Sequence, residues 1–255
     1  MLGITKTAPS WKWAAFGKHS LAGDYFFAGP KDPLFQAFSG WIDTGYKKIG
    51  ASRKNATDIY SWRFCGKGLT PDTLLCGIGR DSFDRHGRPY PFFIMGAGPL
   101  AGYPRRWDLL PFAFESLWSQ MEYLCTKRYI DFSQLEADSQ RLPTPENRWS
   151  ALEADREKRW DAWCSKKPPD QEKIRKALRR NAGTTQFLIP LVEDVFPDVT
   201  STIGLWFSLL KAEEKTMFGT AFFGGNLSET CLAVFKRPLG TADFVQLWSV
   251  GTENQ

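Results

Sequence analysis

The strongest constraint on the fold is a densely charged segment, GRDSFDRHGRPYPF, which covers Gly79 to Phe92. An apolar run from Leu74 to Ile78 precedes it, and a second from Tyr90 to Met95 overlaps its end. Runs of this length and composition are typical of buried strands. Because so many charged side chains are rarely buried together, the segment predicts an exposed connection between two buried strands.

Two residues of this segment predict its backbone shape. Gly87 permits a turn with positive φ, and Pro89 biases Arg88 towards an extended conformation. The connection is therefore expected to be a defined turn.

The side chains of this loop allow two interpretations. Ser82, Asp84, Arg85 and Arg88 could form a recognition surface on a rigid scaffold. Alternatively, Asp84 with Arg88, or Asp81 with Arg85, forms a hydrogen-bond network that only holds the loop, since arginine and carboxylate pair readily. Residue types alone favour the second interpretation.

Two further motifs accompany the charged loop: FGKHSLAGDYF (Phe16 to Phe26) and the stretch Ser61 to Phe64. In chain order, the three motifs resemble the FGKLPSRGDF opening, the PVWRF element and the PSVDRVGRYFPL signature of the TagF/ImpM family, the accessory proteins of bacterial type VI secretion. Gly204 to Phe207 resemble its late SLWW strand. The resemblance assigns the following residues to partner binding or to the family motifs: Gly17, Lys18, Gly23, Asp24, Trp62, Arg63, Ser82, Asp84, Arg85, Gly87, Arg88 and Pro91.

The motifs also depart from the family pattern. His19, Ser20 and Ala22 replace a hydrophobe, a proline and an arginine of the opening motif, and Asp81 and His86 replace a proline and a valine of the loop. A surface that depends on the missing arginine would be altered in this chain.

The resemblance implies a function without catalysis. A TagF-type protein represses type VI secretion after translation, by binding a forkhead-associated scaffold protein or another secretion component. Contact with the inner membrane is expected at most peripherally, through its partners. From the residues themselves, no cofactor, metal or nucleic acid is expected to take part. The resemblance also implies a three-layer α/β sandwich.

The spacing of apolar residues along the chain agrees with a three-layer α/β sandwich. Strands are expected at 13–18, 24–28, 59–65, 73–78, 90–95, 202–209, 217–223 and 231–235. Helices are expected after Pro33, around 110–124, from Pro145 to the Pro168–Pro169 pair, around 173–180, and from a cap at Thr241 through Trp248. This mixture predicts an α/β three-layer sandwich with a central mixed sheet covered by helices.

A single α/β domain over residues 1–255 is expected. Its recognisable TagF-like part would cover 13–125, a charged helical insertion 126–200, and the strands and helix that complete the fold 201–250. The segment Thr126 to Ala182 carries 14 Lys or Arg and 10 Asp or Glu, and so most of the formal charge of +5. Its basic run, Lys173 to Arg180, is expected to complement the dipole of its own helix; binding of phosphate or an acidic partner is the alternative.

Composition argues against several other classes of protein. The chain has no apolar stretch near the ~20 residues of a membrane span and no secretory signal, so a cytoplasmic location is expected. Its two histidines and scattered cysteines argue against a zinc site or a disulfide framework. The five cysteines are expected to be small buried hydrophobes in a reducing compartment: Cys65, Cys76, Cys125, Cys164 and Cys231.

A hydrolase is the alternative function. Ser82, Asp84 and His86 supply the residue types of nucleophile, acid and base within five positions. In an extended segment, however, residues at i, i+2 and i+4 point the same way without converging, and no known nucleophile motif surrounds Ser82.

Overall fold

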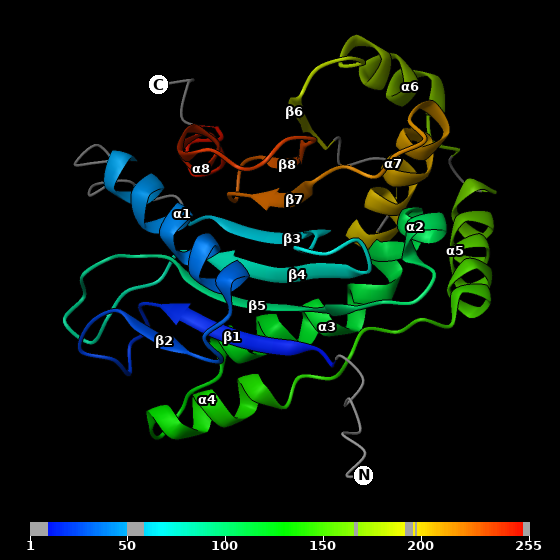
Figure 1. Ribbon diagram of the computed structural model, residues 1–255. Helices are drawn as coiled ribbons and strands as arrows, with labels where there is room; N and C mark the ends of the chain where they lie inside the picture. The colour runs from blue at the N-terminus through cyan, green and yellow to red at the C-terminus, as the bar shows by residue number, and fades with distance from the viewer. Residues whose placement is uncertain (1–9, 50–58, 166–167, 192–195, 197, 252–255) are drawn as a thin grey trace, which may run out of the picture.

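The computed structural model describes residues 10–49, 59–165, 168–191, 196 and 198–251. Within them one sheet has eight strands in the order β2-β1-β5-β4-β3-β7-β8-β6 (Figure 1). Its strands are β1 (Lys12–Gly17), β2 (Phe26–Ala28), β3 (Ser61–Lys67), β4 (Thr73–Arg80), β5 (Phe92–Pro99), β6 (Gln186–Pro190), β7 (Thr220–Gly225) and β8 (Thr230–Phe235).

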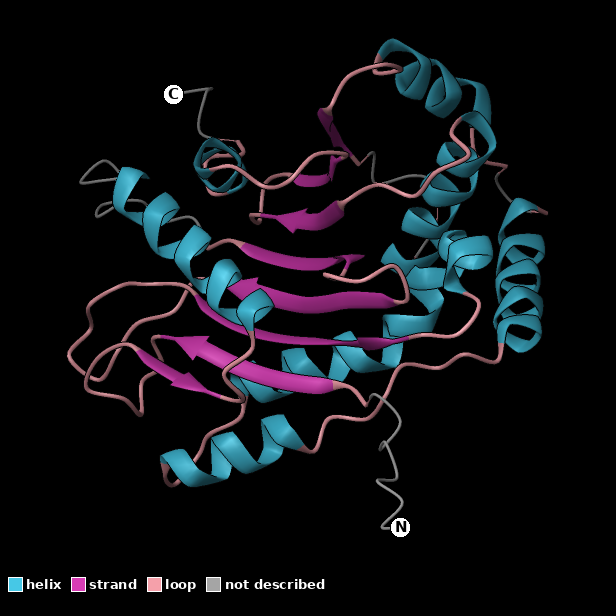
Figure 2. Ribbon diagram, in the orientation of Figure 1, coloured by secondary structure: helices cyan, strands magenta, loops and turns pink. Residues whose placement is uncertain are grey.

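Helices cover both faces of the sheet, which gives three layers (Figure 2). Helices α1 and α8 pack together on one face, and α3, α4 and α7 lie on the other. The helices are α1 (Pro33–Ile49), α2 (Tyr103–Arg106), α3 (Leu110–Thr126), α4 (Phe132–Gln140), α5 (Trp149–Cys164), α6 (Gln171–Arg180), α7 (Val199–Glu213) and α8 (Thr241–Leu247), with a short 3-10 turn, η2 (Trp107–Leu109). The predicted sandwich is confirmed.

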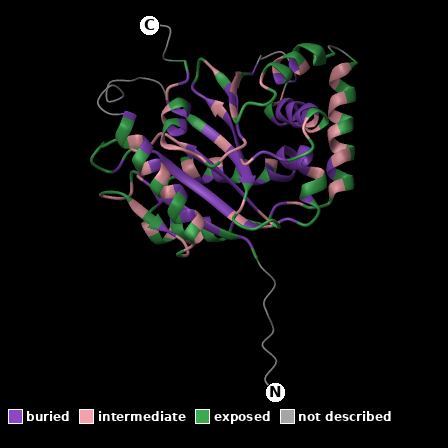
Figure 3. Ribbon diagram, turned by 45° about the horizontal axis from the view of Figure 1, so that its top comes forward, coloured by how far each residue is buried: buried purple, intermediate pink, exposed green. Residues whose placement is uncertain are grey.

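Aromatic rings fill the core on each face of the sheet. Phe244 and Trp248 of the α8 end stack at 4.3 Å between ring centroids, and Trp118 of α3 meets Phe223 of β7 edge-on at 4.7 Å. Such pairs contribute about 0.5–1.5 kcal/mol beyond the area that they bury. Figure 3 shows the strands largely buried between the layers, whereas the surface of α5 is intermediate or exposed.

The sheet differs from the prediction in one respect. Every pairing between neighbouring strands in the described residues is antiparallel, whereas a mixed sheet was predicted. The hairpins β3–β4 and β7–β8 and the long β4–β5 loop join adjacent strands directly, and a direct connection of this kind requires the antiparallel arrangement.

The strand predicted at 202–209 is wrong, because these residues belong to helix α7. Its N-cap, Asp198, accepts a hydrogen bond from the Ser201 N–H at 2.7 Å, and all but one of the residues from Thr200 to Leu210 are buried. A helix buried on all sides lacks the polar face that would give it a helical period. Gly204 to Phe207, matched to a strand of the family, are therefore helical.

Helices α2 and α4, the turn η2 and edge strand β6 were not predicted. Helix α4 is capped by Asp131, which accepts from the Gln134 N–H at 2.9 Å, and edge strand β6 pairs with β8. Both lie in the segment 126–200, together with α5 and α6. The last helix begins at Thr241, but its N-cap is Gly240, whose N–H donates to the Asp243 carboxylate at 2.6 Å.

The charged helices α5 and α6 are held by ion pairs with their neighbours. Arg159 of α5 binds both oxygens of Glu115 on α3, at 2.9 and 2.8 Å, and Arg179 of α6 lies 3.5 Å from Glu213 of α7. Trp160 of α5 stacks on Phe196 at 5.8 Å, as a packing residue. No helix in the described residues is long and apolar enough to cross a membrane.

All five cysteines are free thiols. Cys65, Cys76 and Cys231 are buried as expected, whereas Cys125 and Cys164 are half-buried. No group of three metal-binding side chains occurs in the described residues.

Candidate functional site

The two charged motifs meet at one end of the sheet. Strand β1 ends at Gly17, which pairs with Phe92 at the start of β5, and Phe92 also pairs with Arg80 at the end of β4. The loop after β1 (residues 18–25) and the loop between β4 and β5 (residues 81–91) therefore emerge side by side, at the left of Figure 2. We refer to them together as the motif loops.

Asp84 is the centre of the motif loops. Its side chain is fully buried, and its Oδ1 accepts hydrogen bonds from the backbone N–H groups of His86 at 2.9 Å and Arg88 at 3.0 Å. Its Oδ2 lies 2.7 Å from Arg88 Nε and 3.1 Å from Lys18 Nζ. Each oxygen of this carboxylate therefore has two donors within hydrogen-bond or ion-pair distance.

These contacts hold Asp84 in its ionised form. Burial raises the pKa of this carboxyl, but the hydrogen bonds from Arg88, Lys18 and His86 outweigh burial and keep the pKa well below its usual range. A buried carboxylate bonded in this way fixes the loop strongly, because its charge is costly to bury unless these donors stay in place.

Asp24 and Gly23 connect the other motif loop to the same arginine. Arg88 Nη2 donates to the Gly23 carbonyl at 2.6 Å and lies 3.4 Å from Asp24 Oδ2. Lys18, whose side chain is only 12% exposed, lies between Asp84 and Asp24, at 3.1 and 3.9 Å. Each loop thus supplies charges that fix the other.

Two glycines allow this packing. Gly87 adopts φ +75°, as its place in the loop predicts. Gly17 adopts φ +117°, and a Cβ there would lie 2.1 Å from the carbonyl oxygen of buried Pro91. A side chain at Gly17 would therefore separate the two loops.

The outer surface of the motif loops carries one arginine that no ion pair holds. Arg85 is exposed, and no ion pair joins it to another described residue. Its backbone N–H donates to the Ala22 carbonyl at 2.9 Å, and its guanidinium lies over Gly23, where a Cβ would come within 2.7 Å of it. Phe83, which is 56% exposed, and His86 lie in the same outer stretch.

Trp62 and Arg63 point to opposite faces of β3, as strand alternation predicts. Trp62 is fully buried in the core beneath α1 and α8. Arg63 faces α3, where its Nε and Nη2 donate to Glu122 at 2.6 and 2.9 Å. The ion pair between Asp84 and Arg88 that the loop composition predicts is present, and Arg63 takes no part in it.

Ser82 and His86 do not form a catalytic pair in this geometry. No hydrogen bond joins Ser82 to His86 or to His19 in the part of the chain that the structure describes. His19 is instead buried between Phe92 and Tyr129, and burial lowers its pKa. Asp84 is bonded to Lys18 and Arg88, and its lowered pKa makes it a weak base.

Sequence reasoning missed the role of Asp81. Its carboxylate accepts from the Tyr60 N–H at 2.8 Å and from Trp248 Nε1 at 2.9 Å, so it joins the motif loop to the end of α8. The alternative Asp81/Arg85 network is thus not formed. Trp248 is 167 positions away, and no local pattern could have indicated this contact.

Aromatic side chains border the motif loops on the side of α1. Tyr90 contacts Tyr46 at 4.8 Å and Tyr25 at 5.7 Å between ring centroids, and Tyr46 donates to the Pro89 carbonyl at 3.0 Å. Helix α1 is therefore fastened to the charged loop at its C-terminal end.

Comparison with known proteins agrees with these motifs. The family model described as "TagF N-terminal domain, Type VI secretion system-associated" matches residues 14–143, which is half of the chain and includes both motif loops. The chain belongs to the TagF family. It is thus associated with type VI secretion, as its motifs predict.

A solved structure has a similar fold. The crystal structure of PA0076 from Pseudomonas aeruginosa PAO1 superposes with a TM-score of 0.52 at 16% sequence identity and covers 93% of each chain. At this identity the likeness concerns the fold alone. No curated protein matches the sequence.

Proposed function

We propose that this TagF-family chain represses type VI secretion after translation by binding another protein. The proposed partner is a forkhead-associated scaffold protein of the secretion system or another component of the machinery. Binding would occlude a surface that the partner needs for assembly. The chain would act in the cytoplasm, with no catalytic step, cofactor or nucleic acid, and would contact the inner membrane at most through its partners.

This proposal rests on the different roles of two arginines in the motif loops. Arg88 is bound to Asp84, Asp24 and the Gly23 carbonyl, and so is committed to holding the loops. Arg85, three residues earlier, forms no ion pair with any described residue and lies on the outer surface. A rigid loop that presents an unpaired arginine suits protein recognition, in which arginine is enriched among the residues that dominate affinity.

The position of the motif loops supports the proposal that the chain covers a surface of its partner. They project from one end of an eight-stranded sheet and are linked to α8 through Asp81 and to α1 through Tyr46. Because the backbone of these loops is fixed before binding, little backbone conformational entropy is lost when a partner docks.

Charge reversal at Arg85 tests the proposal. In a bacterium whose own gene is deleted, wild-type chain should restore repression, measured as the release of type VI substrates into the medium. Arg85→Glu should fail to do so and should bind the purified forkhead-associated protein more weakly, by about 2 kcal/mol or more if Arg85 is a dominant contact. Lys158→Glu, an exposed charge on α5, is the matched control.

Full repression and unchanged binding by Arg85→Glu would contradict the proposed surface. If Arg85→Glu abolishes repression but leaves binding to the forkhead-associated protein unchanged, the direct partner is another component.

A further inference from the structure

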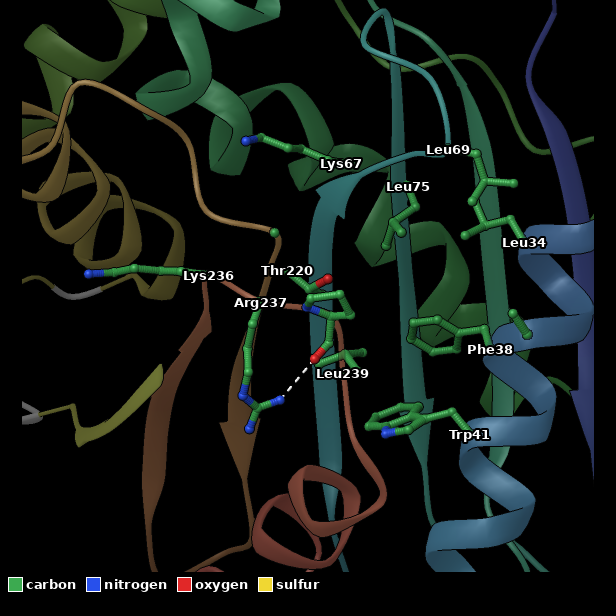
Figure 4. Close-up of a pocket in the computed structure, with 13 residues that line it drawn as sticks. Leu34, Phe38, Trp41, Lys67, Leu69, Leu75, Thr220, Lys236, Arg237 and Leu239 are labelled. Carbon is green, nitrogen blue, oxygen red and sulfur yellow. Dashed lines mark hydrogen bonds between the residues drawn. The ribbon is translucent and has the colours of Figure 1, made fainter. Parts of the chain in front are cut away.

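A half-open pocket of about 460 Å³ lies at the end of the sheet opposite the motif loops (Figure 4). It is bounded by the first half of α1, the end of β3, the start of β7 and the stretch after β8. No residue of the motif loops lines it, so it is a separate feature of the molecule.

One wall of this pocket is apolar and firmly held. Phe38 and Leu75 are buried beneath it, and Leu34 and Leu239 are half-buried at its sides. The Trp41 ring is fixed because its Nε1 donates to the Gly240 carbonyl at 2.8 Å. A preformed apolar wall of this size can accept one or two large side chains.

A second hollow, of about 660 Å³, adjoins the first around the β3–β4 hairpin. Lys67 and Leu69 line both, and Leu69 is 65% exposed between them. The second hollow continues to Tyr103 and to Lys215, which precedes β7. We call the two hollows together the hairpin groove.

The charge of the hairpin groove is positive. Among its lining residues Lys236 pairs with Glu214, and Arg237 binds Asp243 at 2.7 Å. Lys67 and Lys215 form no ion pair with any residue that the structure describes. Figure 4 shows Lys67 and Lys236 on the side of the pocket away from α1, with their ammonium groups directed away from its apolar wall.

Asp72 is the single acidic residue among those that line the groove. A ligand that carries negative charge would therefore meet two uncompensated ammonium groups against one carboxylate.

The backbone at the rim of the hairpin groove limits how a ligand can bind there. The N–H of Lys67 donates to the Gly219 carbonyl, that of Gly68 to Thr73 and that of Gly219 to Phe235, each at 2.8 Å. These three donors are already used within the fold, so a ligand cannot add a strand by pairing with them. The apolar wall and the lysine side chains remain available for recognition.

We propose that the hairpin groove docks a segment of a partner protein in which large apolar side chains stand beside acidic residues. The apolar side chains enter the pocket between Trp41, Phe38 and Leu239, and the carboxylates bind Lys67 and Lys215. The two hollows extend across the end of the sheet, which suits a peptide segment better than a compact small molecule. This interaction is independent of the motif loops.

Labelled peptides test the groove on the full chain. The probe is a fluorescein-labelled peptide Asp-Glu-Leu-Phe-Glu-Asp, with binding followed by fluorescence anisotropy. Two matched peptides separate the contribution of the apolar side chains from that of the negative charge. Asp-Glu-Ala-Ala-Glu-Asp lacks the apolar anchors, and Lys-Lys-Leu-Phe-Lys-Lys reverses the charge. Only the first should bind saturably, and its affinity should fall as salt is added.

Substitutions in the hairpin groove test whether the first peptide binds there. Lys67→Gln with Lys215→Gln should weaken the first peptide about tenfold, because both attractive charges are removed. Leu69→Ser, at a largely exposed position, should also weaken it without a change in melting temperature. Lys173→Gln with Lys176→Gln, which removes two exposed lysines of α6, should change the affinity less than about twofold.

Absence of saturable binding by wild-type chain would overturn the proposal. The proposal would also be overturned if the alanine peptide or the lysine peptide bound as tightly as the first peptide. The same holds if the α6 control variant lost as much affinity as the groove variants. Repression that is sensitive to Arg85→Glu but not to the groove variants leaves the proposed function intact, so the two proposals fail separately.

Discussion

The carboxylate of Asp84 holds Arg88 twice, at its backbone N–H at 3.0 Å and at its Nε at 2.7 Å. The same carboxylate receives Lys18 from the other motif loop. One buried charge thus fixes the turn around Gly87 and the contact between two loops that lie more than 60 positions apart in the chain.

Asp84→Asn should lower the melting temperature at neutral pH, because the amide keeps the shape but loses the charge that Lys18 and Arg88 compensate. Folding lowers the pKa of Asp84, so its stabilisation is complete above the ordinary carboxyl pKa of about 3.9 and is lost as the pH falls below it. The difference in melting temperature between wild type and Asp84→Asn should therefore shrink as the pH is lowered from 5 to about 3. Curves that stay parallel to pH 3 would contradict this role; Asp161→Asn, at an exposed carboxylate of α5, is the control.

Trp62→Ala should cost roughly 3–5 kcal/mol in free energy of unfolding, because the ring is fully buried beneath α1 and α8. Trp62→Phe should cost less. It retains an aromatic ring and removes an indole N–H that has no hydrogen-bond partner in the described residues. Denaturant titrations of both variants measure the difference, and an unchanged midpoint for Trp62→Ala would show that the ring is not part of the core.

Asp81→Ala should destabilise the end of α8. The Tyr60 N–H and the Trp248 indole N–H would lose this acceptor, at a cost of roughly 1–3 kcal/mol. A double-mutant cycle with Trp248→Phe isolates the second contact, and Asp81→Asn, which keeps one carbonyl oxygen, is the conservative comparison. If the two substitutions are additive, Asp81 does not stabilise α8 through Trp248.

Much of the fold was predictable from local patterns. The helix after Pro33 and the strands on both sides of the charged loop have clear periods and clear breaks, and the structure has them within a few residues. The strand predicted at 202–209 failed for a physical reason: α7 is buried on nearly every side, so its sequence has no polar face. Edge strand β6 lacks a long apolar run, and its pairing with β8 is set by tertiary contacts.

The candidate site was predictable in part. Residue types within the loop predicted the pairing of Asp84 with Arg88 and the positive φ of Gly87, because both are local. Lys18 and Asp84 are 66 positions apart, so no local pattern could predict that the two loops meet. The contact of Asp81 with Trp248 and the hairpin groove could not be anticipated, because they join segments from both ends of the chain.

Gly23→Ala should affect binding without affecting stability. A Cβ there would come within 2.7 Å of Arg85 Nη2, the mobile end of a long side chain, so the guanidinium would shift while the backbone remains. The free energy of unfolding should stay within about 0.5 kcal/mol of wild type. The affinity for the partner should fall if Arg85 binds it from its present position, and unchanged affinity would show that this position is not required.

Ser82→Ala and His86→Ala should each leave repression of secretion unchanged. The hydrolase alternative requires Ser82 to donate a proton to a nearby base, yet no hydrogen bond joins it to His86 or His19 within the described residues. Asp84, the third member of that group, is bonded to Lys18 and Arg88 rather than to a histidine. The measurement is the release of type VI substrates by cells that contain equal amounts of each variant, with melting temperatures as the control for folding. A folded Ser82→Ala protein that loses repression while it still binds the partner would favour a catalytic role, because truncation of one hydroxyl removes a nucleophile but leaves the rest of the surface in place.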